Sequence, residues 1–92
     1  MSENKITVVN SDFQGEIFGN EMLLYTLSDT QAVYLNETAH LVWQLCRERR
    51  TVGEVVTFFI ENYPEQKDQV KKDVITTISS LVESNVLTLI DE

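Results

Sequence analysis

The spacing of apolar positions changes at Asn36, from the short alternating runs typical of strands to the period of about 3.6 residues typical of helices. Before Asn36, runs rich in β-branched and aromatic residues are separated by turn-forming residues, and they cover residues 6–9, 14–18, 21–26 and 32–35. Gly19-Asn20 predicts a tight hairpin between two of these runs, and Ser28-Asp29 predicts the next turn. We therefore expect a three-stranded antiparallel sheet within residues 14–35, with residues 1–13 as an arm or an extra strand.

The following part of the chain, residues 36–84, predicts three helices. Asn36 is a favourable N-cap for the first helix, which should end near Glu48. The apolar stripe of this helix comprises Ala39, Val42, Trp43 and Cys46, widened by Leu41 and Leu45. The stretch from Thr51 to Glu54 matches a capping box at the start of the second helix, and Pro64 ends that helix.

The third helix is expected over about residues 65–83 and is the longest of the three. Its inner face should carry Val70, Val74, Ile78, Leu81 and Val82. The tail, residues 85–92, contains an apolar stretch at 86–90 that either adds a strand or folds back onto the core. The predicted core draws mainly on the helices, through Trp43, Val55, Phe59, Val74, Ile78 and Leu81.

Size and charge narrow the classes of function. The 92 residues are expected to form a single domain, residues 1–92, with no room for a large catalytic cleft. Lys and Arg number 7 against 15 Asp and Glu, and the resulting net charge of -8 opposes binding to a phosphate backbone. Neither a signal peptide nor a membrane span is recognisable, and the lone cysteine fits a reducing, cytoplasmic setting. We expect no nucleic acid and no membrane among the partners.

The sequence contains no recognisable catalytic or metal-binding constellation. His40 is the only histidine and Cys46 the only cysteine. We expect His40 to be a surface or boundary residue, with a catalytic base or ligand as the alternative. Cys46 falls in the apolar stripe and should be a small buried hydrophobe, with a nucleophilic thiol as the alternative. Because the three glycines are dispersed, no phosphate-binding loop is present either, so we expect no enzyme activity, no metal and no cofactor.

The few basic residues are unevenly distributed. They gather as Arg47, Arg49 and Arg50 between the first two helices, and as Lys67, Lys71 and Lys72 on the first turns of the third. Each cluster is either an ordinary solvated surface or a local docking patch for an acidic ligand. Ile75 and Ser79 lie next to Lys71 and Lys72 along the third helix; Ile75 either lines a shallow groove with Ser79 or belongs to the core.

The order of these features resembles the PqqD-like proteins, also called RiPP recognition elements. The resemblance covers residues 14–87 and is carried by AVYLN with Trp43 seven residues after Asn36, by RTVGEVV, and by KKDVITTISSLVESNVL in the third helix. One departure is Arg47-Glu48-Arg49-Arg50, where the family often has a small glycine-containing turn. The resemblance implies an α+β fold, with a three-stranded antiparallel sheet followed by a three-helix, winged-helix-like bundle.

The resemblance also implies a function. Such proteins are non-catalytic peptide chaperones that bind the leader of a ribosomally made precursor peptide by β-strand addition and present it to a modifying enzyme in natural-product or quinone-cofactor biosynthesis. That enzyme is a radical-SAM protein, a peptidase or a cyclodehydratase. An edge strand suits this role because its unpaired backbone groups accept a guest strand, and residues 31–35 contain no proline or charged residue to prevent it.

On this interpretation the peptide-binding residues belong to two elements. The expected set is Gln31, Ala32, Val33, Tyr34 and Leu35 on the strand, and Lys71, Lys72, Ile75 and Ser79 on the third helix. The strand residues pair through their backbone, and the lysines meet acidic leader residues. Either Val33 and Leu35 or Ala32 and Tyr34 face the core.

Other classes are less favoured. A winged-helix DNA-binding domain would share the helical half, but it needs a basic recognition helix, whereas the third helix also carries Asp68, Asp73 and Glu83. A small enzyme lacks its catalytic residues, and an unrelated interaction module is the remaining alternative. An open edge can also pair with a second copy of itself, which leaves a homodimer open. The sequence does not identify which precursor is bound or which modifying enzyme receives it.

Overall fold

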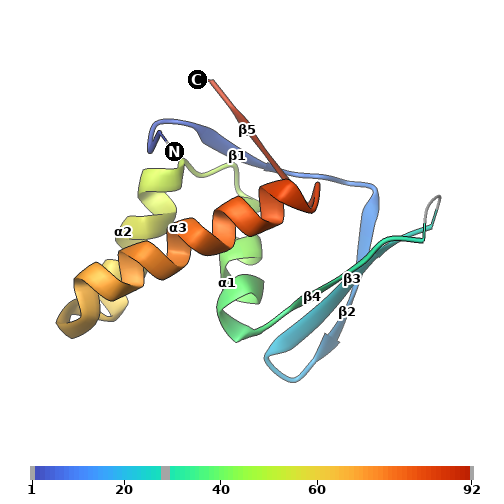
Figure 1. Ribbon diagram of the computed structural model, residues 1–92, viewed down its shortest axis with the longest axis horizontal. Coiled ribbons are helices and arrows are strands. Elements are labelled where there is room, and N and C mark those ends of the chain that lie inside the picture. The colour runs from blue at the N-terminus through green and yellow to red at the C-terminus, as the bar shows by residue number, and fades with distance from the viewer. Residues whose placement is uncertain (1, 28–29, 92) are drawn as a thin grey trace.

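The computed structural model describes residues 2–27 and 30–91, so the turn expected at Ser28-Asp29 lies outside the described residues. Within these residues the chain forms two small antiparallel sheets and three helices (Figure 1). The strands are β1 (Ile6–Val9), β2 (Phe13–Phe18), β3 (Glu21–Thr26), β4 (Ala32–Leu35) and β5 (Leu87–Ile90). The helices are α1 (Glu37–Cys46), α2 (Val52–Asn62) and α3 (Lys67–Glu83), with a 3-10 turn, Pro64–Gln66, before α3. The predicted α+β class, with its three-stranded sheet and three helices, is confirmed.

The larger sheet is the predicted meander, in the order β2-β3-β4. Gly19 has a φ of +63° at the first position of the two-residue turn between β2 and β3, as a type II′ hairpin requires. The run at residues 6–9 does not extend this sheet. Instead β1 pairs with β5, from Ile6 opposite Ile90 to Val9 opposite Leu87, so the two ends of the chain form a second sheet. The apolar tail therefore adds a strand, which was one of its two predicted outcomes.

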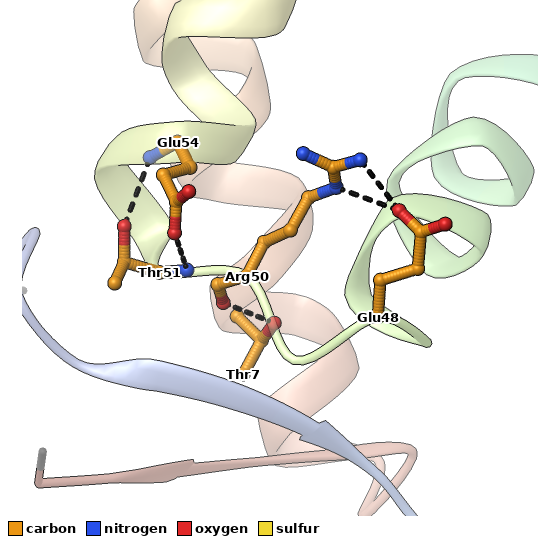
Figure 2. Close-up of polar contacts among 5 residues, drawn as sticks. All are labelled: Thr7, Glu48, Arg50, Thr51 and Glu54. Carbon is orange, nitrogen blue, oxygen red and sulfur yellow. Dashed lines mark hydrogen bonds and ion pairs between the residues drawn. The ribbon is translucent and has the colours of Figure 1, made fainter.

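Local capping places the starts of α1 and α2 where the sequence predicts them. The Asn36 side chain accepts a hydrogen bond from the Ala39 backbone N–H at 2.9 Å. At the start of α2 the Glu54 N–H donates to the Thr51 hydroxyl at 3.1 Å, and the Thr51 N–H donates to the Glu54 carboxylate at 2.9 Å (Figure 2). Helix α1 ends at Cys46, slightly before the expected Glu48.

The connection between α1 and α2 is attached to β1. The Thr7 hydroxyl donates to the Arg50 carbonyl at 2.6 Å, and the Arg50 guanidinium pairs with Glu48 at 2.5 Å (Figure 2). The Thr7 N–H donates to the same carbonyl at 2.9 Å. Arg49 adopts a left-handed conformation with a φ of 58°. The predicted basic cluster therefore lies partly in intramolecular contacts.

One apolar cluster joins the helices to the inner face of the larger sheet. Val55, Phe59, Val74, Ile78 and Leu81 are buried as predicted, whereas Trp43 is half-buried and packs against the cluster. Among residues 2–27 and 30–91, none of the helices combines the length and hydropathy needed to cross a bilayer. Within the same residues, His, Cys, Asp and Glu do not come together in a group that could hold a metal ion.

Candidate functional site

Strand β4 is an edge strand, since it pairs with β3 on one side and with no other strand in the described part of the chain. The Thr26 N–H donates to the Gln31 carbonyl at 3.1 Å, which makes these two opposed residues a hydrogen-bonded pair. Because bonded and non-bonded pairs alternate along an antiparallel ladder, Val33 and Leu35 also bond to β3. The backbone N–H and C=O groups of Ala32 and Tyr34 therefore point away from the sheet.

The two faces of β4 are now distinguishable. Leu35 is buried and Val33 is half-buried against the core, so this pair faces inward. Ala32 and Tyr34 lie on the outer face, and 61% of Tyr34 is exposed. The Tyr34 hydroxyl donates a hydrogen bond to the Glu21 carboxylate, and this bond to an anionic acceptor raises the pKa of Tyr34.

A groove runs between β4 and α3, and we call it the edge groove. Its volume is about 280 Å³, and its lining residues come from β4, the start of α1 and the second half of α3: Val33, Tyr34, Leu35, Asn36, Ala39, Thr76, Thr77, Ser80 and Leu81. The α3 side contributes three hydroxyl groups, and no charged residue lines the groove. Since a strand added to β4 would lie beside this groove, its alternate side chains would meet apolar and hydroxyl-bearing partners.

A second hollow follows the edge groove toward the beginning of α3, and we call it the helix pocket. It has a volume of about 340 Å³ and is lined by residues of all three helices and the turn before α3: Glu37, Thr38, Leu41, Phe59, Tyr63, Gln66, Val70, Asp73 and Val74. Asp73 lies one helical turn before Thr77 of the edge groove, so the two hollows share one side of α3. The helix pocket differs from the edge groove in carrying two carboxylates.

Only some of the predicted binding residues lie at the edge groove. Val33, Tyr34 and Leu35 line it, Ala32 presents backbone groups at its edge, and the Gln31 side chain donates to the Ser84 carbonyl at 2.6 Å.

The four predicted α3 residues do not line the groove. Lys71 approaches Glu3 at 3.5 Å, and Ile75 packs against the core. Lys72 is exposed one turn before Thr76, and Ser79 is half-buried. The sequence identifies the buried stripe of α3, but it does not indicate which flank of that stripe faces β4. The flank that does carries Thr76, Thr77 and Ser80.

The two residues with catalytic potential are packed inside the fold. His40 is buried, which corrects its expected surface or boundary position. Its Nδ1 lies 3.0 Å from the Asn20 carbonyl and its Nε2 lies 3.0 Å from the Gln44 side-chain nitrogen. A single tautomer, with the proton on Nδ1, satisfies both contacts. Cys46 is fully buried, and burial raises the pKa of its thiol. Both residues hold the fold together, and neither lines the edge groove.

The fold and the groove define a class of protein: a small α+β domain whose antiparallel sheet has a free edge beside its last helix. The model of the family described as Coenzyme PQQ synthesis protein D (PqqD) matches residues 21–87. The chain belongs to this family, which confirms the resemblance to PqqD-like proteins.

A solved structure shares the fold at low sequence identity. It is described as "TbiB1 in Complex with the TbiA(beta) Leader Peptide", and it matches with a TM-score of 0.73 and 18% identity, covering 87% of this chain and 93% of that chain. The comparison with curated proteins finds no match.

Proposed function

We propose that this protein binds the leader segment of a ribosomally synthesised precursor peptide as an additional antiparallel strand on β4. The observation that carries the proposal is the pair of residues, Ala32 and Tyr34, whose backbone groups face outward beside the edge groove. Membership of the PqqD family supports it, as does the shared fold with TbiB1, a protein solved with a leader peptide. Antiparallel addition extends the existing sheet order and gives the slightly more stable form of pairing.

In this proposal the backbone groups of β4 supply affinity, and the side chains of the edge groove supply selectivity. Ala32 and Tyr34 each offer one N–H and one C=O, so main-chain pairing supplies binding with little demand on the guest sequence. The groove between them and α3 then selects side chains, with Thr76, Thr77 and Ser80 as hydrogen-bonding partners. Lys72 is exposed one turn before Thr76, within reach of an acidic leader residue at the rim, whereas Lys71 faces Glu3.

The protein itself acts without catalysis in this proposal. It presents the bound leader to a separate modifying enzyme in the cytoplasm, of the radical-SAM, peptidase or cyclodehydratase class. The family resemblance likens the three helices to a winged-helix bundle. In this proposal they support the sheet that binds the peptide. A winged-helix role on DNA is disfavoured by the net charge of -8, because it raises the cost of approaching a polyanion.

Replacing Ala32 by proline tests the proposal. The substitution removes a backbone N–H that points away from β3, so the sheet keeps its own hydrogen bonds while the guest loses one. We expect peptide affinity to fall at least about threefold to tenfold, the value of one hydrogen bond, with added loss from crowding by the ring. The probes are peptides selected against the wild-type protein from a displayed library of random sequences, and their affinity is measured by fluorescence anisotropy.

Ile17→Pro is the matched control, because the Ile17 N–H points outward from β2, at the opposite edge of the same sheet. This variant should bind the selected peptides as wild type does. Amide shifts in labelled protein should cluster on residues 32–35 and 76–81 when peptide is added. Equal affinity of Ala32→Pro and wild type, or shifts confined to other surfaces, would contradict the proposal.

A further inference from the structure

We propose that the helix pocket binds a basic side chain, Lys or Arg, from the leader residues that precede the strand paired with β4. This inference rests on the function proposed above and extends it to a second subsite. It assigns a role to a hollow that strand addition alone leaves unused, and it fixes on which side of the paired segment the basic residue lies.

The direction of the guest follows from the relative orientation of β4 and α3. At the start of β4, the Gln31 side chain reaches the Ser84 carbonyl, beyond the end of α3. At the end of β4, Leu35 and Asn36 line the edge groove with the middle of α3, so β4 and α3 run in opposite directions (Figure 1). A guest antiparallel to β4 therefore runs in the same direction as α3. Its earlier residues leave the groove past Asn36, toward the helix pocket.

The spacing of the two hollows sets the position of the basic residue. Asp73 and Val70 in the helix pocket precede Thr77 in the edge groove by four and seven residues, and all three lie on one side of the helix. At about 1.5 Å per helical residue, the separation is about 6–10 Å. An extended chain covers this distance in roughly two to three residues. The basic side chain should therefore lie about two to three residues before the guest residue nearest Leu35.

The lining of the helix pocket matches the chemistry of a long basic side chain. Leu41 and Val70, both half-buried, provide apolar surface for an aliphatic stem above the buried Phe59 and Val74. Glu37 and Asp73 supply carboxylates for the cationic head, and no basic residue lines the pocket. Glu37 lies in the first turn of α1, and the unit charge of a carboxylate exceeds the positive partial charge of about one half at a helix N-terminus. Among the nearby basic residues, Lys71 lies on the other flank of α3 beside Glu3.

The test is a selection experiment with two forms of the protein. A displayed library of random peptides, long enough to span both hollows, is selected against wild type and against the double variant Glu37→Gln with Asp73→Asn. Amide shifts and truncation identify the segment of each selected peptide that pairs with β4. With wild type we expect Lys or Arg to be enriched about two to three residues before the guest residue nearest Leu35, and this enrichment to disappear with the double variant.

Individual peptides then give the size of the effect. A peptide with the basic residue should bind the double variant about 3- to 20-fold more weakly than wild type, the range given by two partly exposed ion pairs. The control is Glu61→Gln with Glu83→Gln, which makes the same change in net charge at two exposed positions outside both hollows. This control should bind as wild type does at matched ionic strength.

The outcomes separate the two proposals. Peptides that pair with β4 but show no preference before the paired segment contradict the helix-pocket proposal and leave strand addition intact. A basic preference that follows the paired segment also contradicts it, because the guest would then run parallel to β4. Failure to obtain any peptide that shifts the amides of β4 contradicts the proposed function, and the helix-pocket proposal with it.

Discussion

At the scale of single residues, the buried thiol of Cys46 gives a pH-dependent contribution to stability. Burial raises the pKa of Cys46, and the Thr7 hydroxyl offsets this only in part. Because the folded protein disfavours the thiolate, the contribution is fully present below the unfolded pKa of about 8.5 and is lost as pH rises toward the folded pKa. The Cys46→Ala variant lacks this effect, although it is less stable at neutral pH because of the cavity it creates.

We expect the free energies of unfolding of wild type and Cys46→Ala to converge as pH rises above about 8.5. Urea denaturation followed by the fluorescence of Trp43 measures both proteins between neutral pH and pH values near 10. A constant difference across this range would show that the thiol titrates alike in the folded and unfolded states. Reaction of Cys46 with a thiol reagent gives an independent check, since it should proceed only at the rate of unfolding or local opening.

At the scale of elements, the start of α2 depends on one reciprocal pair of hydrogen bonds. Thr51→Ala removes the hydroxyl that accepts from the Glu54 N–H and should lower the free energy of unfolding by about 1 kcal/mol. Thr57→Ala, an exposed change within the same helix, should cost much less and serves as the control. Thermal or urea unfolding of the two variants measures these losses. If tertiary packing alone fixed the start of α2, both variants would lower the free energy of unfolding by the same amount.

The hydrogen bonds between Thr51 and Glu54 also make the stability of the protein depend on pH. Hydrogen bonds from the Thr51 backbone and side chain lower the pKa of Glu54 in the folded protein. The associated stability is therefore present above the unfolded pKa, about 4.3, and is lost as pH falls through the folded pKa. The difference between wild type and Thr51→Ala should shrink in that acidic range.

The helix starts and the pairing of β1 with β5 show which parts of the fold can be predicted from the sequence. Helix starts at Asn36 and Thr51 are predictable because the cap and its partner lie three residues apart in the chain. The pairing of β1 with β5 joins residues more than 75 positions apart, from Ile6 with Ile90 to Val9 with Leu87, and no short pattern encodes such a contact. The sequence allows each of these two runs to form a strand, but their pairing depends on how the helices between them pack.

At the scale of the whole molecule, the same limit applies to the candidate site. The open edge is predictable because residues 31–35 lack proline and charge, which is a local property. Which α3 residues face this edge depends on how α3 is rotated about its axis relative to the sheet. The apolar pattern defines the buried stripe of α3, but it does not indicate which of the two flanks of that stripe faces β4. In the structure the flank with Thr76, Thr77 and Ser80 faces β4. The α3 side of the edge groove could therefore not be predicted from the apolar pattern alone.

The open edge and the net charge of -8 have opposite effects on association between copies of the protein. Unpaired groups on β4 favour edge-to-edge pairing, whereas charges of one sign repel two copies at the separation that pairing requires. At an ionic strength of about 0.1 M the repulsion extends over about 10 Å, and at about 1 M over about 3 Å. We therefore expect a monomer at low salt and neutral pH, and a growing population of dimers as salt is raised.

Sedimentation velocity across this salt range measures the two populations. Ala32→Pro should remain monomeric at high salt because it blocks the β4 edge, whereas Ile17→Pro, which alters the opposite edge, should associate as wild type does. A selected peptide that pairs with β4 should dissociate the wild-type dimer, since the guest and the second copy compete for the outward groups of Ala32 and Tyr34. Dimers that form equally in Ala32→Pro and resist the peptide would use another surface. In that case the β4 edge would be a site for the peptide alone.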